Sequence, residues 1–154
     1  MRLRISVAAL ALPLAAGAAY GAEFSAPIVS QPGATVGAAF GPRAESAGIH
    51  PGTDIAVAAG TAVHAPASGR VLRVGAPGAL NGYGGQVVEI DHGDRVRTRY
   101  SNLDGVTLTE GAEIRAGDTI GRIRAMDRPH VHVELWRDGA LVDPAHEIAL
   151  IAAD

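Results

Sequence analysis

The sequence predicts an all-β fold, an antiparallel β sandwich or barrel-like single domain. The chain of 154 residues is long enough for one domain with a hydrophobic core and too short for two comfortable ones. Its 20 Gly and 9 Pro, against one Trp, three Tyr and two Phe, disfavour a helical bundle and suit short strands joined by tight turns. Short runs with β-branched residues also recur about every ten residues, as is typical of antiparallel strands.

The composition excludes several classes of protein and site. Hydrophobic residues make up 47% and charged residues 19% of the chain, unlike an intrinsically disordered sequence. The 13 basic residues are all Arg and the formal charge is −3, so the chain has no electrostatic footprint for nucleic acid. The absence of Cys excludes disulfides, Cys-ligated zinc and thiol catalysis. Any metal must therefore be held by His and carboxylate ligands.

Residues 1–22 are expected to be a secretory signal peptide. Met1-Arg2-Leu3-Arg4 supplies a basic start, an apolar run follows from Ile5 to Ala19, and small residues surround Gly21. A membrane anchor is the alternative, but a run of about 15 residues is shorter than the roughly 20 that a spanning helix needs. The mature protein is therefore expected to be secreted or periplasmic and acidic, with no stable membrane span.

The rest of the chain divides into an arm and a domain. Residues 23–47 are rich in Ala, Gly, Ser and Pro with little periodicity, which predicts a partly ordered N-terminal arm. The packed domain is expected over residues 48–148. Within it, β-branched runs bounded by turn signals predict strands over residues 54–57, 62–65, 70–74, 86–91, 96–101, 119–123 and 131–136.

One pair of these strands is predicted to form a hairpin. The segments 86–91 and 95–100 are separated by the tight polar turn His92-Gly93-Asp94. In the second arm Arg residues alternate with Val, Thr and Tyr, which predicts that one face is solvated. These are Arg95, Arg97 and Arg99.

A His-x-His pair lies in the last predicted strand. Because residues two apart in a strand share a face, His130, His132 and Glu134 lie on one side, opposite a stripe of Val and Leu. A lone His-x-His is more often a pair of surface residues than a site. A second observation is therefore needed before it indicates chemistry.

That observation is a second His with a carboxylate upstream. His50 and Asp54 are four residues apart around a turn that contains Pro and Gly, and such a turn can direct both side chains to one point. Together with one imidazole of the His-x-His strand they would form a zinc site of two His and one carboxylate, with the fourth position left for water. Structural zinc sites usually close with four protein ligands, mostly Cys, so catalysis is the more natural reason for such a site here.

The chain resembles the LytM/lysostaphin-type zinc metallopeptidases, which are cell-wall endopeptidases. The pattern His-x-x-x-Asp early and His-x-His late is shared, and the resemblance covers about Phe40 to Pro144. Further similar motifs are Gly60-Thr61-Ala62-Val63-His64-Ala65-Pro66-Ala67-Ser68-Gly69-Arg70-Val71, Tyr83-Gly84, Ile90-Asp91-His92-Gly93, Thr98-Arg99-Tyr100, Gly117-Asp118-Thr119-Ile120-Gly121 and Pro129-His130-Val131-His132-Val133-Glu134.

The resemblance implies a role for each candidate residue. It makes His50, Asp54 and His132 the zinc ligands, and His130 the histidine that acts on the attacking water or the tetrahedral intermediate. The family's second catalytic His, in a Tyr-x-His-Leu motif, is replaced by Asn102 in Tyr100-Ser101-Asn102-Leu103. An amide cannot act as a base but can donate a hydrogen bond to an oxyanion, so reduced activity is expected. Tyr83, near the expected groove, is a candidate for stacking on substrate.

The resemblance implies a secreted zinc endopeptidase that cuts the peptide cross-links of peptidoglycan, with Zn²⁺ as cofactor and peptidoglycan peptide stems as partner. Because Asn102 stands in place of a His, the alternative is a non-catalytic module of the same fold that binds peptidoglycan or regulates another cell-wall hydrolase. A lipoyl-like or biotinyl-like carrier domain is excluded, because the chain has no Lys to which the group could be attached.

Overall fold

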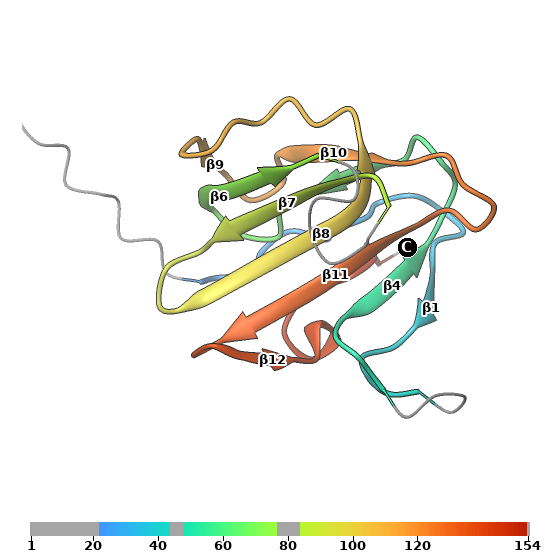
Figure 1. The fold of residues 1–154 in the computed structure, drawn as a ribbon, viewed down its shortest axis with the longest axis horizontal. Helices are drawn as coiled ribbons and strands as arrows, with labels where there is room; N and C mark the ends of the chain where they lie inside the picture. Colours follow the sequence, from blue (N-terminus) through green and yellow to red (C-terminus); the bar gives the residue numbers. More distant parts are fainter. Residues whose placement is uncertain (1–21, 44–47, 77–83, 154) are drawn as a thin grey trace, which may run out of the picture.

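The computed structural model describes residues 22–43, 48–76 and 84–153, which form an almost entirely β structure (Figure 1). The predicted signal peptide, apart from Ala22, and Tyr83 lie outside these residues. The elements are β1 (Thr35–Ala38), β2 (Gly41–Pro42), β3 (Ile49–His50), β4 (Thr53–Ala56), β5 (Ala62–His64), β6 (Gly69–Gly75), β7 (Gln86–Asp91), β8 (Val96–Asp104), β9 (Glu113–Ile114), β10 (Thr119–Ile123), β11 (His130–Arg137), β12 (Ala140–Val142) and the single-turn 3-10 helix η1 (Pro144–His146).

Most strands belong to one antiparallel sheet. Its order is β1-β4-β11-β8-β7-β6-β9, and β12 also pairs with β11. The C-terminal end of β8 pairs with β10, which in turn pairs with β5, so the sheet branches there instead of closing into a barrel. The predicted antiparallel all-β fold is confirmed. The two long strands β8 and β11 run side by side through its middle (Figure 1).

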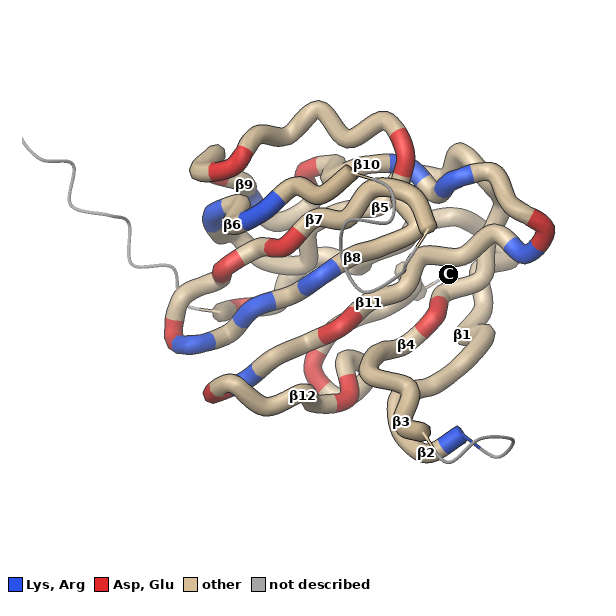
Figure 2. The backbone as a smooth tube through the Cα atoms, in the orientation of Figure 1, with Lys and Arg blue, Asp and Glu red and all other residues tan. Residues whose placement is uncertain are grey.

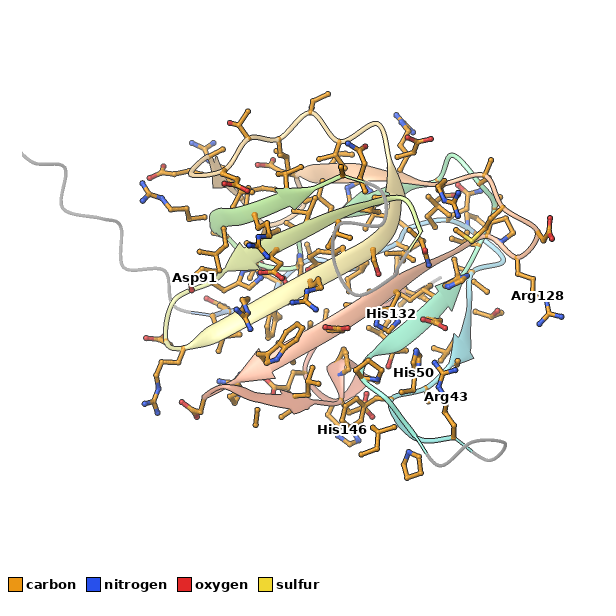
Figure 3. All side chains as sticks on the ribbon, viewed as in Figure 1. Arg43, His50, Asp91, Arg128, His132 and His146 are labelled. Carbon is orange, nitrogen blue, oxygen red and sulfur yellow. The ribbon has the colours of Figure 1, made fainter. Side chains whose placement is uncertain are left out.

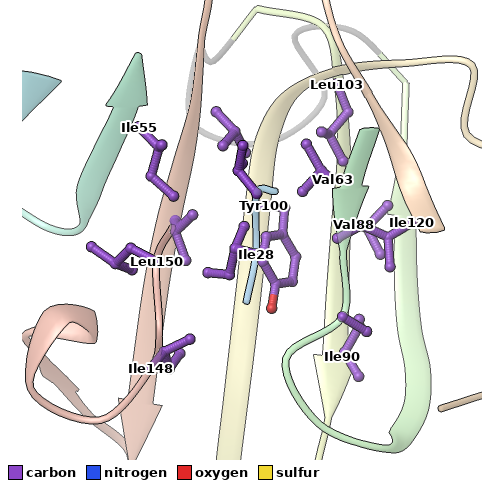
Figure 4. Packing of buried hydrophobic residues seen from close by; sticks show 14 of the residues in the cluster. Ile28, Ile55, Val63, Val88, Ile90, Tyr100, Leu103, Ile120, Ile148 and Leu150 are labelled. Carbon is purple, nitrogen blue, oxygen red and sulfur yellow. The ribbon is translucent and has the colours of Figure 1, made fainter. Parts of the chain in front are cut away.

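The hydrophobic core lies against one face of this sheet (Figure 4). Tyr100 of β8 and Ile55 of β4 point into it and are fully buried. Ile28 and Leu150 join them from opposite ends of the described chain, where the backbone of Ile28 and Val29 bonds to that of Ala149 and Leu150 at 3.0 and 3.1 Å. The charged residues Asp54 of β4 and Arg99 of β8 alternate with these core residues and therefore lie on the other face.

The segment before residue 48 is more structured than the sequence indicates. Ile28 and Val29 are fully buried, and Thr35–Ala38 pair with β4 as strand β1. The packed body therefore begins upstream of Gly48, and it also continues past residue 148 to Leu150 and Ile151. All four residues of β1 are exposed, so no alternation of apolar and polar residues marks it as a strand.

The predicted strands agree closely with the observed ones. The segments 86–91 and 119–123 have the predicted bounds, and the other five each overlap an observed strand. The 86–91 strand forms the predicted hairpin with β8, through a turn in which Gly93 and Asp94 have φ of 78° and 48°. The prediction of a solvated Arg face is right for Arg95, which is 80% exposed, but wrong for Arg99, which is 12% exposed. Arg99 lies mid-sheet between two acidic residues of the neighbouring strands.

Candidate metal centre

Strand pairing brings two of the predicted ligands together. β4 runs antiparallel to β11, and the register pairs Asp54 with His132 and Ala56 with His130. Cross-strand partners point to the same face, here the face opposite the core. The predicted placement of His130, His132 and Glu134 on one face is therefore confirmed.

His50 reaches the same point because the chain turns tightly before β4. A Cβ on Gly52 would lie 2.1 Å from the carbonyl oxygen of Val133, so only glycine lets this turn rest on β11. His50, at the end of β3, then lies beside His132 (Figure 3). The segment His50-Pro51-Gly52-Thr53-Asp54 thus places both of its candidate ligands at one point, and the close approach of β11 requires its glycine.

The three side chains converge on one small volume. His50 Nε2 lies 3.2 Å from His132 Nδ1 and 3.3 Å from Asp54 Oδ1, and His132 Nδ1 lies 2.7 Å from Asp54 Oδ1. One ligand atom from each lies within 4.8 Å of the others. Both imidazoles are buried, while the Asp54 side chain is 19% exposed, so the cluster is open to solvent on the carboxylate side.

Outer hydrogen bonds fix which atoms face the centre of the cluster. His50 Nδ1 donates to the carbonyl oxygen of Ala39 at 2.9 Å, and His132 Nε2 donates to Glu134 Oε1 at 3.1 Å. With these protons assigned, the neutral rings direct lone pairs of His50 Nε2 and His132 Nδ1 toward each other and toward Asp54. Three acceptors this close require a cation between them, either a proton or a metal. Two imidazoles and a carboxylate, with outer hydrogen bonds orienting the rings, are a donor set suited to Zn²⁺.

The pKa values of this cluster follow from the same contacts. Burial raises the pKa of Asp54, but the hydrogen bond and the charge of His132, with two further imidazoles nearby, outweigh it and lower the pKa. Burial lowers the pKa of His132, but its hydrogen bonds to Asp54 and Glu134 outweigh that effect and raise the pKa. The cluster therefore favours a bound positive charge.

A buried charge network holds Glu134 in place. Arg99 Nη1 donates to Glu134 Oε2 at 3.1 Å, and Arg99 Nε donates to Glu89 Oε1 at 2.7 Å. These residues are cross-strand partners on β11, β8 and β7, where the blue positions of β8 lie between red ones (Figure 2). The Arg99 guanidinium also lies over the Trp136 ring, with 4.6 Å from Cζ to the ring centroid. The role of Arg99 was missed by sequence reasoning, because it depends on the register between β8 and β11.

His130 and Asn102 lie at the edge of the cluster. Asn102, near the end of β8, has φ of 64°, a left-handed conformation that Asn tolerates better than most residues. Its Nδ2 lies 2.9 Å from His130 Nε2, which is 3.9 Å from Asp54 Oδ2. His130 Nδ1 donates to the carbonyl oxygen of Arg128 at 2.7 Å. The structure thus brings all five described candidates together, while Tyr83 is outside the described residues.

The remaining His residues do not join the cluster. His92 is fully buried, with Nδ1 2.9 Å from the carbonyl oxygen of Ser68 and Nε2 2.7 Å from Thr98 Oγ1. The His64 ring bonds to the carbonyl oxygen of Gly117 at 3.2 Å, and the His146 side chain is 84% exposed. Across residues 22–43, 48–76 and 84–153, the group of His50, Asp54 and His132 is the one metal-ligand cluster found. Within the same residues, no helix is of a length and apolarity that would cross a bilayer.

The chain is similar in sequence to several known proteins of the bacterial cell envelope or cell wall, judged by their names. Over 99 residues the chain is 36% identical to the "DD-carboxypeptidase/endopeptidase Mpg" of Neisseria meningitidis, covering 62% of this chain and 22% of that protein. It is 33% identical over 122 residues to the "Murein hydrolase activator NlpD" of Salmonella dublin, covering 78% of this chain and 32% of that protein. The chain thus spans a third or less of the length of these curated relatives.

The fold has solved relatives as well. The solution structure of lysostaphin superposes with a TM-score of 0.68 at 25% identity, covering 80% of this chain and 53% of that one. The family pattern described as "Peptidase family M23" matches residues 48–144, which include all the candidate residues named above. The resemblance to LytM/lysostaphin-type peptidases is confirmed. By this match, and by the metal-ligand geometry within it, the chain belongs to peptidase family M23.

Proposed function

We propose that this protein is a zinc metalloendopeptidase of the bacterial cell envelope that hydrolyses peptide cross-links of peptidoglycan. The observation that carries the proposal is the convergence of His50 Nε2, Asp54 Oδ1 and His132 Nδ1, with the other ring nitrogen of each histidine bonded outward. Membership of a peptidase family and the name of the relative Mpg support the reaction class. Relatives named as lipoproteins support an envelope location.

In this proposal His50, Asp54 and His132 hold Zn²⁺, and His130 moves the proton. Zinc bound there would activate water for attack and polarise the scissile carbonyl. His130 Nδ1 carries the ring proton and donates it in a hydrogen bond to the carbonyl oxygen of Arg128, so Nε2 is the basic atom, and it faces the cluster. When the hydrogen bond from Asn102 is released, the Nε2 lone pair can accept a proton from the attacking water and return it to the leaving amine.

Asn102 supplies a hydrogen bond in place of a second imidazole. Its Nδ2 donates to His130 Nε2 at 2.9 Å as long as that nitrogen holds a lone pair. Once His130 is protonated at Nε2, this bond is lost and the amide is free to donate to the developing oxyanion. A neutral donor stabilises negative charge less than an imidazolium does, so the enzyme is expected to be slow.

The second candidate function is a non-catalytic domain that binds peptidoglycan or activates another cell-wall hydrolase. Asn102 favours it, because the amide cannot titrate, and so does the relative named as a murein hydrolase activator. The intact ligand set and His130 favour the enzyme. The two functions differ in whether the purified protein alone generates new amino termini in peptidoglycan.

The test is digestion of purified peptidoglycan by the zinc-loaded protein, followed by mass analysis of the released fragments. The enzyme is supported by products of peptide-bond hydrolysis that disappear with a chelator and return with zinc. A zinc-bound protein that releases nothing alone, but accelerates a separate cell-wall hydrolase, supports the second candidate. His132→Ala is the control that removes the metal.

A further inference from the structure

A pocket lies on the same face of the sheet as the metal cluster, farther along the strands. Trp136 is four positions after His132 on β11, so both side chains stand on one face. The register pairs Trp136 with Arg97 of β8, and Arg97 with Asp91 of β7, so this row crosses three strands. These three residues, with the 43% exposed Leu72 of β6, line a volume of about 270 Å³. Figure 3 shows Asp91 well apart from His132 on this face.

The guanidinium of Arg97 lies in this pocket without a polar partner. Its Cζ is 4.7 Å from the centroid of the Trp136 ring, and its Nε is buried and has no hydrogen-bond partner. Although Asp91 is the cross-strand partner of Arg97, no ion pair joins the two among the residues that the structure describes. Buried donors in proteins are nearly always satisfied, so an unpaired guanidinium nitrogen indicates a group that binds there.

Asp91 supplies an acceptor to the same pocket. Its Oδ1 accepts from the backbone N–H of Gly93 at 2.9 Å, which orients the carboxylate, while no bond to Oδ2 is found within the described part of the chain. The other Arg of the pocket, Arg95, is already paired with Asp138 at 2.5 Å. Among the described lining residues, one unpaired cation and one unpaired anion therefore remain, and their charges cancel. Such a pocket suits a neutral ligand with donors and acceptors better than it suits a carboxylate.

Trp136 and Leu72 add apolar surface beside these two polar groups. A sugar ring has C–H groups on its faces, which pack against an aromatic ring, and hydroxyl groups at its rim, which both donate and accept hydrogen bonds. An indole next to a guanidinium and a carboxylate matches this chemistry. Arg99, which is fixed by its own ion pairs, also contacts the indole, with 4.6 Å from Cζ to the ring centroid, and holds it in place. The pocket is smaller than the roughly 300–1,000 Å³ of sites for drug-sized ligands, so it suits a single sugar ring.

We propose that this pocket binds a sugar ring of the glycan strand of peptidoglycan, while the peptide attached to that strand extends to the metal cluster. Trp136 is four residues from His132, which is about 13 Å along an extended strand. A peptide of about four extended residues spans the same distance. This inference rests on the proposed function for the identity of the substrate. The bound sugar then sets which bond of the attached peptide reaches the metal.

The intrinsic fluorescence of the protein reports directly on this pocket, because Trp136 is the one Trp of the chain. The first probe is a β-1,4-linked tetramer of N-acetylglucosamine, a neutral glycan without peptide, and the second is a free stem peptide without sugar. The tetramer is expected to shift the emission of Trp136 and to bind saturably. Its affinity should be the same in zinc-loaded and metal-free protein, because the pocket is remote from the metal ligands. The stem peptide should leave the emission of metal-free protein unchanged.

Calorimetry measures the affinity of four variants for the tetramer. Trp136→Ala removes the ring and Arg97→Met removes the donors, and each should lose about tenfold or more in affinity. Trp136→Phe keeps an aromatic surface and should lose less. Arg115→Met is the matched control, because it removes an exposed Arg outside the pocket and should not change the affinity. Thermal melting establishes that each variant is folded.

Cleavage kinetics distinguish sugar binding from a structural role of Trp136. Trp136→Ala should raise KM for peptidoglycan with little change in kcat, because the lost contact is present in the ground state and the transition state alike. KM for cross-linked stem peptides without sugar should not change. A merely structural role would raise KM for both substrates.

The outcomes separate this inference from the function on which it rests. If the tetramer does not bind, or binds Trp136→Ala as tightly as the unchanged protein, the sugar pocket is wrong whether or not the protein cleaves. If the stem peptide binds metal-free protein and this binding depends on Arg97, the pocket takes a carboxylate and the proposal is overturned. If the tetramer binds with the expected dependence but zinc-loaded protein cleaves nothing, the sugar pocket stands and the peptidase is wrong.

Discussion

Asn102 Nδ2 and His130 Nε2 lie 2.9 Å apart, and an amide nitrogen can only donate. The bond therefore requires an unprotonated Nε2. This agrees with the hydrogen bond that His130 Nδ1 donates to the carbonyl oxygen of Arg128, which places the ring proton on Nδ1. The His130 side chain, 28% exposed, is thus held as the tautomer whose basic atom faces the cluster. The replacement that the sequence marks as a departure from the family pattern therefore bonds directly to the residue that the proposed function makes the general base.

The first prediction concerns Asn102 itself. Asn102→His should raise kcat for peptidoglycan cleavage by about tenfold or more, because an imidazolium adds charge stabilisation in the transition state that an amide lacks. KM should change less than kcat, since the ground-state contacts are kept. Steady-state kinetics on zinc-loaded proteins measures both. Equal and complete inactivity of both proteins with zinc bound would instead support the hydrolase-regulating function.

The second prediction separates the two histidines of β11. His130→Ala should retain zinc and lose about 10²-fold or more in cleavage rate, because it removes the group that transfers the proton. His132→Ala should lose the metal. Zinc content after dialysis, measured beside the cleavage rate, distinguishes the two effects. Loss of zinc from His130→Ala, with retention in His132→Ala, would mean that the ligand and base assignments are reversed.

The third prediction concerns the network behind His132. Glu134→Ala should weaken zinc binding by about 10-fold to 100-fold, because the ring of His132 loses the acceptor that orients it. Glu134→Gln keeps an accepting oxygen and should weaken binding less. The exposed pair of Arg95 and Asp138 offers a matched control, and Arg95→Gln should leave zinc affinity unchanged. Competition with a chromophoric chelator measures these zinc affinities. An unchanged zinc affinity for Glu134→Ala would show that Glu134 does not orient the ring of His132 for metal binding.

The fourth prediction concerns the pH dependence of stability. Burial lowers the pKa of His92 below its unfolded value of 6.5, although hydrogen bonds to backbone carbonyls oppose it. Below pH 6.5 the His92 ring therefore takes up a proton more readily in the unfolded chain than in the folded one. The stability that comes from neutral His92 is therefore fully present above about pH 6.5 and is lost as pH falls toward the folded pKa, by at most about 1.4 kcal/mol per pH unit.

The measurement is the unfolding free energy of metal-free protein from pH 7.5 to 5, approximately spanning this window. His92→Gln removes the titrating group, so its stability should fall less steeply with decreasing pH than that of the unchanged protein. Contributions from His132 are common to both proteins and cancel in the comparison. Parallel pH profiles would show that His92 is not the group responsible.

The sequence carried most of the information on the long strands and on the residues of the metal-ligand cluster. Strands such as 86–91 have β-branched runs and clear turn signals at both ends, so local pattern was sufficient. His50 and Asp54 were predictable because one short turn joins them, and His130 and His132 because a strand has a period of two. The glycine between the first pair is required by β11, a reason that only the structure supplies.

What could not be predicted depends on pairing between distant segments. Arg99 and Glu134 are 35 residues apart and meet only through the register of β8 and β11, so Arg99 looked like a solvated residue. β1 consists of exposed, mostly small residues and has no periodicity, although it lines a cavity beside the cluster. The two-residue strands β2, β3 and β9 are too short to carry a periodic signal.

The most direct test of the account is a zinc titration of the metal-free protein with peptidoglycan present, measuring the initial rate at which new amino termini appear. The account predicts a slow rate that rises in proportion to added zinc and levels off at one equivalent, with no such rise for His132→Ala. A protein that binds one equivalent of zinc and still releases no amino termini would contradict it.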